Sequence, residues 1–112
     1  GTSAIHLSLL CHDVKKDDIV LSSSLTFCGA VNPILYIGAK PILIDSNFDD
    51  WNIDIALLIR GIESAPKKPK AILITHLFGM PADFEALQKI GEKYGIPIIH
   101  DLAEAIGCKV KE

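Results

Sequence analysis

Four short apolar runs constrain the fold of this chain more than any other feature of its sequence. They cover residues 19–21 (IVL), 42–44 (ILI), 71–74 (AILI) and 96–99 (IPII), and none of them alternates with polar residues. Continuous runs of Ile, Val and Leu are typical of strands buried on both faces, as in a parallel sheet. The gaps between the runs are long enough to hold crossover helices.

The gaps carry helical patterns of differing strength. In the clearest, residues 82–94, the apolar residues fall on one stripe and Gly95 supplies a stop. Weaker patterns cover residues 3–10, 29–37 and 53–62, and a further helix-like segment follows Asp101. Strands that alternate with helices predict an α/β fold, with a doubly wound, mostly parallel sheet and right-handed crossover helices.

Size and charge narrow the class of protein. The chain has 112 residues, 49% of them hydrophobic, which predicts a single folded domain. A net charge of −3 gives no reason to expect a nucleic acid or an anionic membrane as partner, and no apolar run approaches the roughly 18 residues of a membrane span. We interpret the one basic run, residues 67–70 (KKPK), as a solvated turn.

The cysteines and histidines point to no metal and no disulfide framework. There are three cysteines without a CxxC pair, and the four histidines form no HExxH pattern. This usage predicts a protein of the reducing cytoplasm. Nucleotide-binding GxGxxG and GxxxxGK[ST] loops and the GxSxG nucleophile motif are absent from the sequence.

In doubly wound sheets, ligands bind beyond the carboxyl ends of the strands, so the residues that follow each run are the candidates. Thr2 and Ser3 at a helix start could hold an anion or could simply cap the helix. Phe27 could be a platform for a planar ring or a core residue. Asp101 could hold a ring nitrogen or could form a capping box with Glu104. For His76 in the same region, a bond to the backbone at the strand exit is the favoured role over catalysis.

Five segments in register resemble one family. They are residues 1–10 (GTSAIHLSLL), residues 17–46 with a Ser-x-Thr-Phe and a Gly-Ala-Lys-Pro element, residues 51–54 (WNID), residues 74–87 (ITHLFGMPADFEAL) and residues 98–107 (IIHDLAEAIG). The chain resembles the DegT/DnrJ/EryC1/StrS family of pyridoxal-phosphate-dependent sugar aminotransferases. The resemblance implies a part of the large domain of fold type I, the aspartate aminotransferase-like fold.

The resemblance also implies roles for individual residues. Asp101 matches the aspartate that pairs with the pyridinium nitrogen of the cofactor, and Phe27 matches the aromatic residue that stacks on its ring. Thr2 and Ser3 match the residues that hold the phosphate. Glu104 stands near the cofactor face, where the family usually has glutamine, and a carboxylate cannot donate as an amide does.

Two further departures from the family lie beside Asp101: His100 replaces a common glutamate and Leu102 a common alanine. The lysine that carries the cofactor lies beyond the aspartate motif in the family, and Lys109 and Lys111 come too early to match it. We therefore expect residues 1–112 to be a single partial cofactor-binding domain, without the N-terminal segment and the C-terminal part that holds this lysine, and inactive alone.

The resemblance implies an enzyme that moves an amino group, from glutamate, to a nucleotide-linked keto-sugar, in polysaccharide biosynthesis and as a homodimer. Two alternatives stay open. One is a sugar dehydratase of the same family, in which the lysine is replaced. The other is a non-catalytic α/β binding module in which Asp101 is only a cap.

Overall fold

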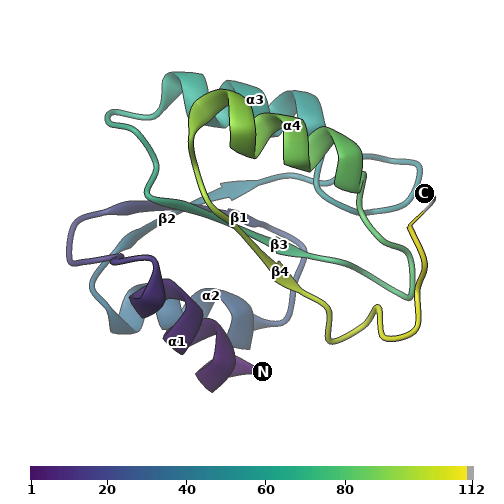
Figure 1. Cartoon of the computed structure of the whole chain (residues 1–112), viewed down its shortest axis with the longest axis horizontal. Coiled ribbons are helices and arrows are strands. Elements are labelled where there is room, and N and C mark those ends of the chain that lie inside the picture. Colours follow the sequence, from purple (N-terminus) through teal and green to yellow (C-terminus); the bar gives the residue numbers. More distant parts are fainter. Residues whose placement is uncertain (111–112) are drawn as a thin grey trace.

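The structure is a computed structural model that describes residues 1–110. Within these residues, four strands form one sheet in the order β2-β1-β3-β4, and each neighbouring pair is parallel. The strands are β1 (Ile19–Ser23), β2 (Lys40–Ile44), β3 (Ala71–Thr75) and β4 (Ile98–Asp101). Their carboxyl ends lie along one edge of the molecule (Figure 1).

Two pairs of helices cover the sheet. Helices α1 (Thr2–Cys11) and α2 (Cys28–Tyr36) pack on one face, and α3 (Ile55–Ser64) and α4 (Phe84–Tyr94) pack on the other (Figure 1). The chain passes from β1 outward to β2 and then returns across β1 to β3. The predicted doubly wound parallel α/β fold is confirmed, and the strand order places its switch point between β1 and β3.

The central strands explain why the apolar runs do not alternate. All five residues of β1 and all five of β3 are buried. Val20 and Leu73 join the core under α1 and α2, while Leu21 and Ile72 join the core under α3 and α4. Because both faces of the sheet are covered by helices, each face demands apolar side chains.

The segment after β4 departs from the sequence prediction. Residues 102–107 form turns, not the expected helix, so the alternative of a capping box between Asp101 and Glu104 is wrong. Asp101 is the last residue of β4, and its Oδ1 accepts a hydrogen bond from the Ala103 N–H at 3.1 Å. The Gly79 N–H donates to the Glu104 carbonyl at 2.8 Å, so this segment pairs with the loop after β3. That tertiary pairing outweighs the local helix signal.

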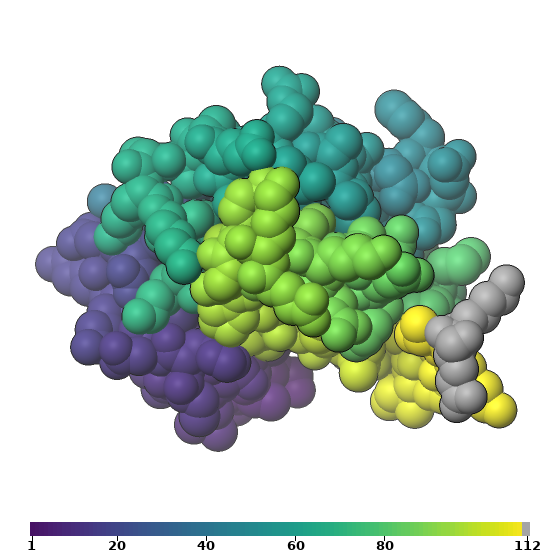
Figure 2. Space-filling view, turned by 45° about the horizontal axis from the view of Figure 1, so that its top comes forward, coloured from purple at the N-terminus to yellow at the C-terminus, as the bar shows by residue number. Residues whose placement is uncertain are grey.

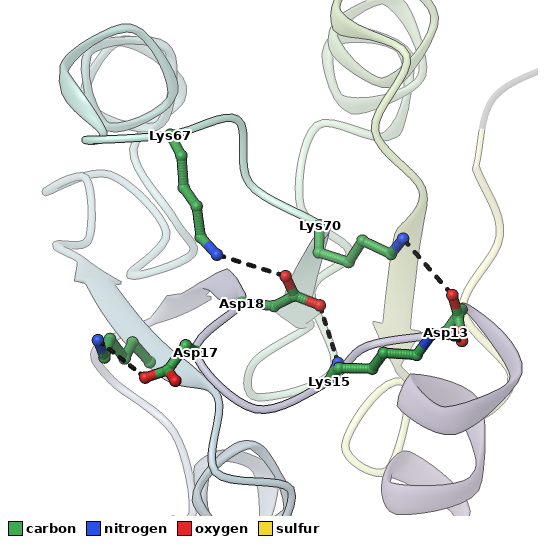
Figure 3. Close-up of polar contacts among 7 residues, drawn as sticks. Asp13, Lys15, Asp17, Asp18, Lys67 and Lys70 are labelled. Carbon is green, nitrogen blue, oxygen red and sulfur yellow. Dashed lines mark hydrogen bonds and ion pairs between the residues drawn. The ribbon is translucent and has the colours of Figure 1, made fainter.

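At the opposite edge, where the strands begin, acids and lysines alternate around the entry to β1 (Figure 3). Asp18 accepts from the Lys15 N–H at 2.8 Å and from Lys67 Nζ at 3.5 Å. The bond from the Lys15 N–H is the main cause that lowers the pKa of Asp18; burial opposes it, and the charges of Lys67 and Lys70 lower the pKa further. The basic run at residues 67–70 thus has acidic neighbours, and its exposed pairs contribute little stability each.

Residues 51–54 (WNID) connect two loops through side-chain hydrogen bonds. The Asn52 side chain is buried and accepts from the Leu77 N–H at 3.0 Å. Its amide nitrogen donates to the Met80 carbonyl at 3.1 Å. Asp54 caps α3 by accepting from the Leu57 N–H. Asn52 therefore fixes the loop that follows β3 from a segment that follows β2.

Among residues 1–110, none of the helices is long and apolar enough to cross a membrane.

We predict that Asn52→Ala lowers the free energy of unfolding by about 2–4 kcal/mol, because a buried N–H and a carbonyl lose their partners together. Urea denaturation followed by circular dichroism measures the change. Gln88→Ala, on the exposed side of α4, is the control and should stay within about 0.5 kcal/mol of the original protein. Equal stability of the two variants would contradict the role given to Asn52.

Candidate functional site

A small pocket lies at the switch point of the sheet, at the carboxyl ends of β1, β3 and β4. The amino ends of α1 and α2 close its sides. Its lining brings together Thr2, Phe27, Asp101 and Glu104, four of the five residues that the sequence singled out. Ser3 lies in the first turn of α1 but is exposed and outside this lining.

A pair of hydroxyl groups spans the floor of the pocket. A hydrogen bond of 2.8 Å joins Thr26 Oγ1 and Thr75 Oγ1, one residue from the loop after β1 and one from the end of β3. Thr75 is also the parallel-register neighbour of Asp101. The sequence predicted Thr75 among the residues of the strand exits but assigned it no role. The signal was present, since its place at the end of a buried strand puts it beside Asp101.

The amino end of α1 has no capping side chain. Gly1 occupies the N-cap position, so Thr2 and Ser3 are helical residues, and the first turn contains no acid. This differs from α3 and α4, where Asp54 and Asp83 cap the helix. The simple capping alternative for Thr2 and Ser3 is therefore wrong. The amide groups of this first turn stay available to an external acceptor.

Phe27 stands at the N-cap of α2 with 74% of its surface exposed, so it is not a core residue. Its ring lies against Gly29, where an added Cβ would come within 2.7 Å of the ring and 2.6 Å of Thr2 Oγ1. The missing side chain at Gly29 lets Phe27 and Thr2 approach each other. Phe27 thus forms an aromatic wall at the mouth of the pocket.

Asp101 presents a half-buried carboxylate to the pocket. Its backbone carbonyl accepts from the His76 N–H at 3.1 Å, which fixes the end of β4 against the end of β3. One carboxylate oxygen is occupied by the Ala103 N–H. The Glu104 side chain is held differently, since its Oε2 accepts from the Phe78 N–H at 2.9 Å. Glu104 therefore ties down the loop after β3 while it also borders the pocket.

Two histidines lie under Asp101 on the other face of the sheet. His76 is 1% exposed, and its Nε2 lies 2.9 Å from Nδ1 of His100. The Ala82 N–H donates to Nδ1 of His76 at 3.0 Å. Because an amide can only donate, His76 carries its proton on Nε2 and donates it to His100. The expected structural role of His76, a bond to the backbone at the strand exit, agrees with this geometry.

Both histidines are held neutral. Burial lowers the pKa of His76, the charge of a protonated His100 lowers it further, and Asp101 partly opposes both. Burial alone lowers the pKa of His100. A proton on Nδ1 of either ring would also face another N–H and break one hydrogen bond of the chain Ala82–His76–His100.

We predict that acid destabilises the protein through this pair. Since the folded pKa values lie below the unfolded value of about 6.5, the unfolded chain binds more protons as the pH falls below that value, and the free energy of unfolding falls. In His100→Gln the amide oxygen can still accept from His76, and one titrating group is gone.

Urea denaturation at pH 7 and pH 5 tests this. From pH 7 to pH 5, the free energy of unfolding should fall by about 1 kcal/mol more in the original protein than in His100→Gln. If the free energy of unfolding falls equally in the two proteins, the histidine pair is not the cause of the lower stability in acid.

The chain is similar in sequence to known aminotransferases. The model of the DegT/DnrJ/EryC1/StrS aminotransferase family matches residues 1–112. EpsN of Bacillus subtilis is 40% identical over 99% of this chain and 29% of its own length. GDP-perosamine synthase of Escherichia coli O157:H7 is 37% identical, over 99% of this chain and 30% of its own.

A crystal structure of NtdA from Bacillus subtilis with the bound cofactor PMP has a TM-score of 0.88 and 29% identity. The match covers 96% of this chain and 24% of NtdA. This chain therefore spans less than a third of the length of these three proteins.

The sheet order and the pocket at its switch point define the class of protein: this is the α/β fold of the fold type I aminotransferases. The chain belongs to the DegT/DnrJ/EryC1/StrS aminotransferase family, as the five sequence segments predicted.

Proposed function

We propose that the protein containing this chain is a pyridoxal-phosphate-dependent sugar aminotransferase. One observation carries the proposal: the carboxylate of Asp101 and the uncapped amino end of α1 border the same pocket. The first would pair with a basic ring nitrogen, and the second would bind a phosphate. Pyridoxal phosphate carries both groups: a basic ring nitrogen and, through a methylene on another ring position, a phosphate.

The pocket's residues fit this cofactor in chemistry as well as in position. Asp101 has one carboxylate oxygen engaged by Ala103, which leaves the other for a protonated ring nitrogen. Phe27 offers an exposed aromatic face to the ring, and Gly29 removes the side chain that would push Phe27 and Thr2 apart. The volume, about 90 Å³, lies well below the range of small-ligand pockets, so residues 1–110 would supply one wall of the site.

Each residue then has a definite task. Thr2 and Ser3 would donate hydrogen bonds to the phosphate, from a side-chain hydroxyl and from the amide groups of the first turn of α1. Asp101 would keep the ring nitrogen protonated, and Phe27 would hold the ring plane. Glu104 would hold the loop after β3 through the Phe78 N–H. Pyridoxal phosphate, when bound, supplies an electron-accepting ring that can carry an amino group between substrates.

For the substrate, we propose a nucleotide-linked keto-sugar with glutamate as amino donor, in polysaccharide biosynthesis in the cytoplasm. The similarity to GDP-perosamine synthase supports the nucleotide sugar. We propose that the full protein is a homodimer and that a lysine beyond residue 112 carries the cofactor, so that residues 1–112 alone are inactive.

The decisive experiment is to mix the purified full-length protein with pyridoxal phosphate and record its visible spectrum. A new absorbance band that persists through gel filtration would support the proposal. No band would favour a non-catalytic α/β module. A band without amino transfer, together with another residue at the lysine position, would favour a sugar dehydratase.

We predict that Asp101→Asn in the full-length protein lowers the rate of amino transfer by about 100-fold or more, because a neutral amide cannot hold the ring nitrogen protonated. The rate with a keto-sugar nucleotide and glutamate measures this. Asp17→Asn makes the same chemical change at the opposite edge of the sheet, where Asp17 pairs with Lys40, and should leave the rate unchanged. A near-normal rate in Asp101→Asn would overturn the role of Asp101.

A further inference from the structure

A second hollow lies on the same edge of the sheet, at the carboxyl ends of β1 and β2. Its volume is about 400 Å³, within the range of small-ligand pockets. Ser24 and Leu25, from the loop that also carries Phe27, form one side. The loop of residues 45–54 forms the other, and projects at the end of the molecule where the chain's yellow C-terminal residues lie (Figure 2).

Two aromatic side chains of this loop face solvent. Phe48 is 93% exposed and Trp51 is 53% exposed, and both line the hollow. Trp51 also has a left-handed backbone, with φ of 64°, which is unfavourable for a bulky residue. Exposed rings and backbone strain both cost stability in the free chain, and such strain concentrates at functional sites.

The loop is also rigid. Asn47 Oδ1 accepts from the N–H groups of Asp49 and Asp50, and its amide nitrogen donates to Asp50 at 2.7 Å. Asp50 in turn accepts from the Asn52 N–H at 2.9 Å, directly after Trp51. The position of the Trp51 backbone is therefore fixed before any ligand arrives, which reduces the entropy lost on binding.

Asp45 supplies the polar end of the hollow. Its Oδ1 accepts from the Ser46 N–H at 2.8 Å and from the Ser24 hydroxyl at 3.5 Å. Its Oδ2 has no hydrogen-bond donor among residues 1–110, so a ligand that donates hydrogen bonds finds a ready acceptor beside the two rings.

We propose that this hollow binds the base of the nucleotide-linked sugar, and that the base is guanine. The inference rests on the proposed function and adds the identity of the nucleotide. Guanine presents two donors, its ring N–H and its exocyclic amine, side by side on one edge, and the open Oδ2 of Asp45, with its two lone pairs, can accept them. Its flat face stacks on Trp51 and Phe48.

The negative charge around the hollow favours the base, and not the diphosphate, as the part of the nucleotide that binds there. Asp45, Asp49 and Asp50 make this loop acidic, which repels a diphosphate but not a neutral ring that donates to Asp45. Adenine and uracil each place an acceptor within their pairing edge, next to a donor, and that acceptor would face a carboxylate oxygen. Asp45 therefore selects guanine.

The test is isothermal titration of the full-length protein with GMP, AMP and UMP, without sugar or cofactor. GMP should bind at least about 10-fold more tightly than AMP or UMP. Trp51→Ala and Phe48→Ala should each weaken GMP binding, Trp51→Ala by about 10-fold. Asp45→Asn should bring the GMP and AMP affinities within about 2-fold of each other.

Phe78→Ala is the matched control. Phe78 is an exposed aromatic residue with φ of 55° that follows β3, and it lies outside this hollow. Its loss should leave GMP binding unchanged. Because Phe48 is almost fully exposed, its variant should fold even if Trp51→Ala does not.

Equal binding of the three nucleotides, or GMP binding that none of these variants changes, would overturn the guanine site. The Trp51 emission, isolated as the difference from Trp51→Phe, adds a second readout. If it responds to protein concentration and not to GMP, the hollow is a contact between two copies and the proposal is wrong. A visible cofactor band without GMP binding would show that the guanine-site proposal is wrong and that the aminotransferase proposal is still supported.

Discussion

The pairing of β1 with β3 is the interaction on which the rest of the structure depends. Both strands are buried along their whole length, and each has helices on both faces. Because the chain leaves β1 toward β2 on one side and leaves β3 toward β4 on the other, the loops beyond these two strands separate and open a pocket between them. The hydroxyl pair of Thr26 and Thr75 joins the two exits at that point.

Around Thr26 and Thr75, groups that attract positive charge and groups that attract negative charge border the same pocket. Asp101 brings a carboxylate, while α1 and α2 begin without side-chain caps. Beneath Asp101, the neutral histidine pair joins the end of β4 to the loop after β3 without adding a charge. On the β2 side, Asn52 and the network around Asn47 hold a second loop in place. The edge of the sheet is thus rigid on both sides of the pocket.

The sequence predicted the strands because burial on both faces leaves a continuous apolar run, and it located α4 through its stripe and Gly95. It failed after Asp101, where a local capping pattern was overruled. Glu104 bonds the Phe78 N–H and the Gly79 N–H bonds the Glu104 carbonyl, both about 26 residues away in the chain. No local pattern contains such partners, so a helix was predicted where turns are found.

The sequence by itself determined the fold class, the family and the identity of the residues at the strand exits, because periodicity, composition and motif order are properties of the chain. The tertiary structure decided which of them meet. It left the first turn of α1 without a capping side chain, exposed Phe27, joined Thr75 to Thr26 and paired His76 with His100. The physical reason is that proximity across parallel strands depends on sheet order and register, which link residues far apart in sequence.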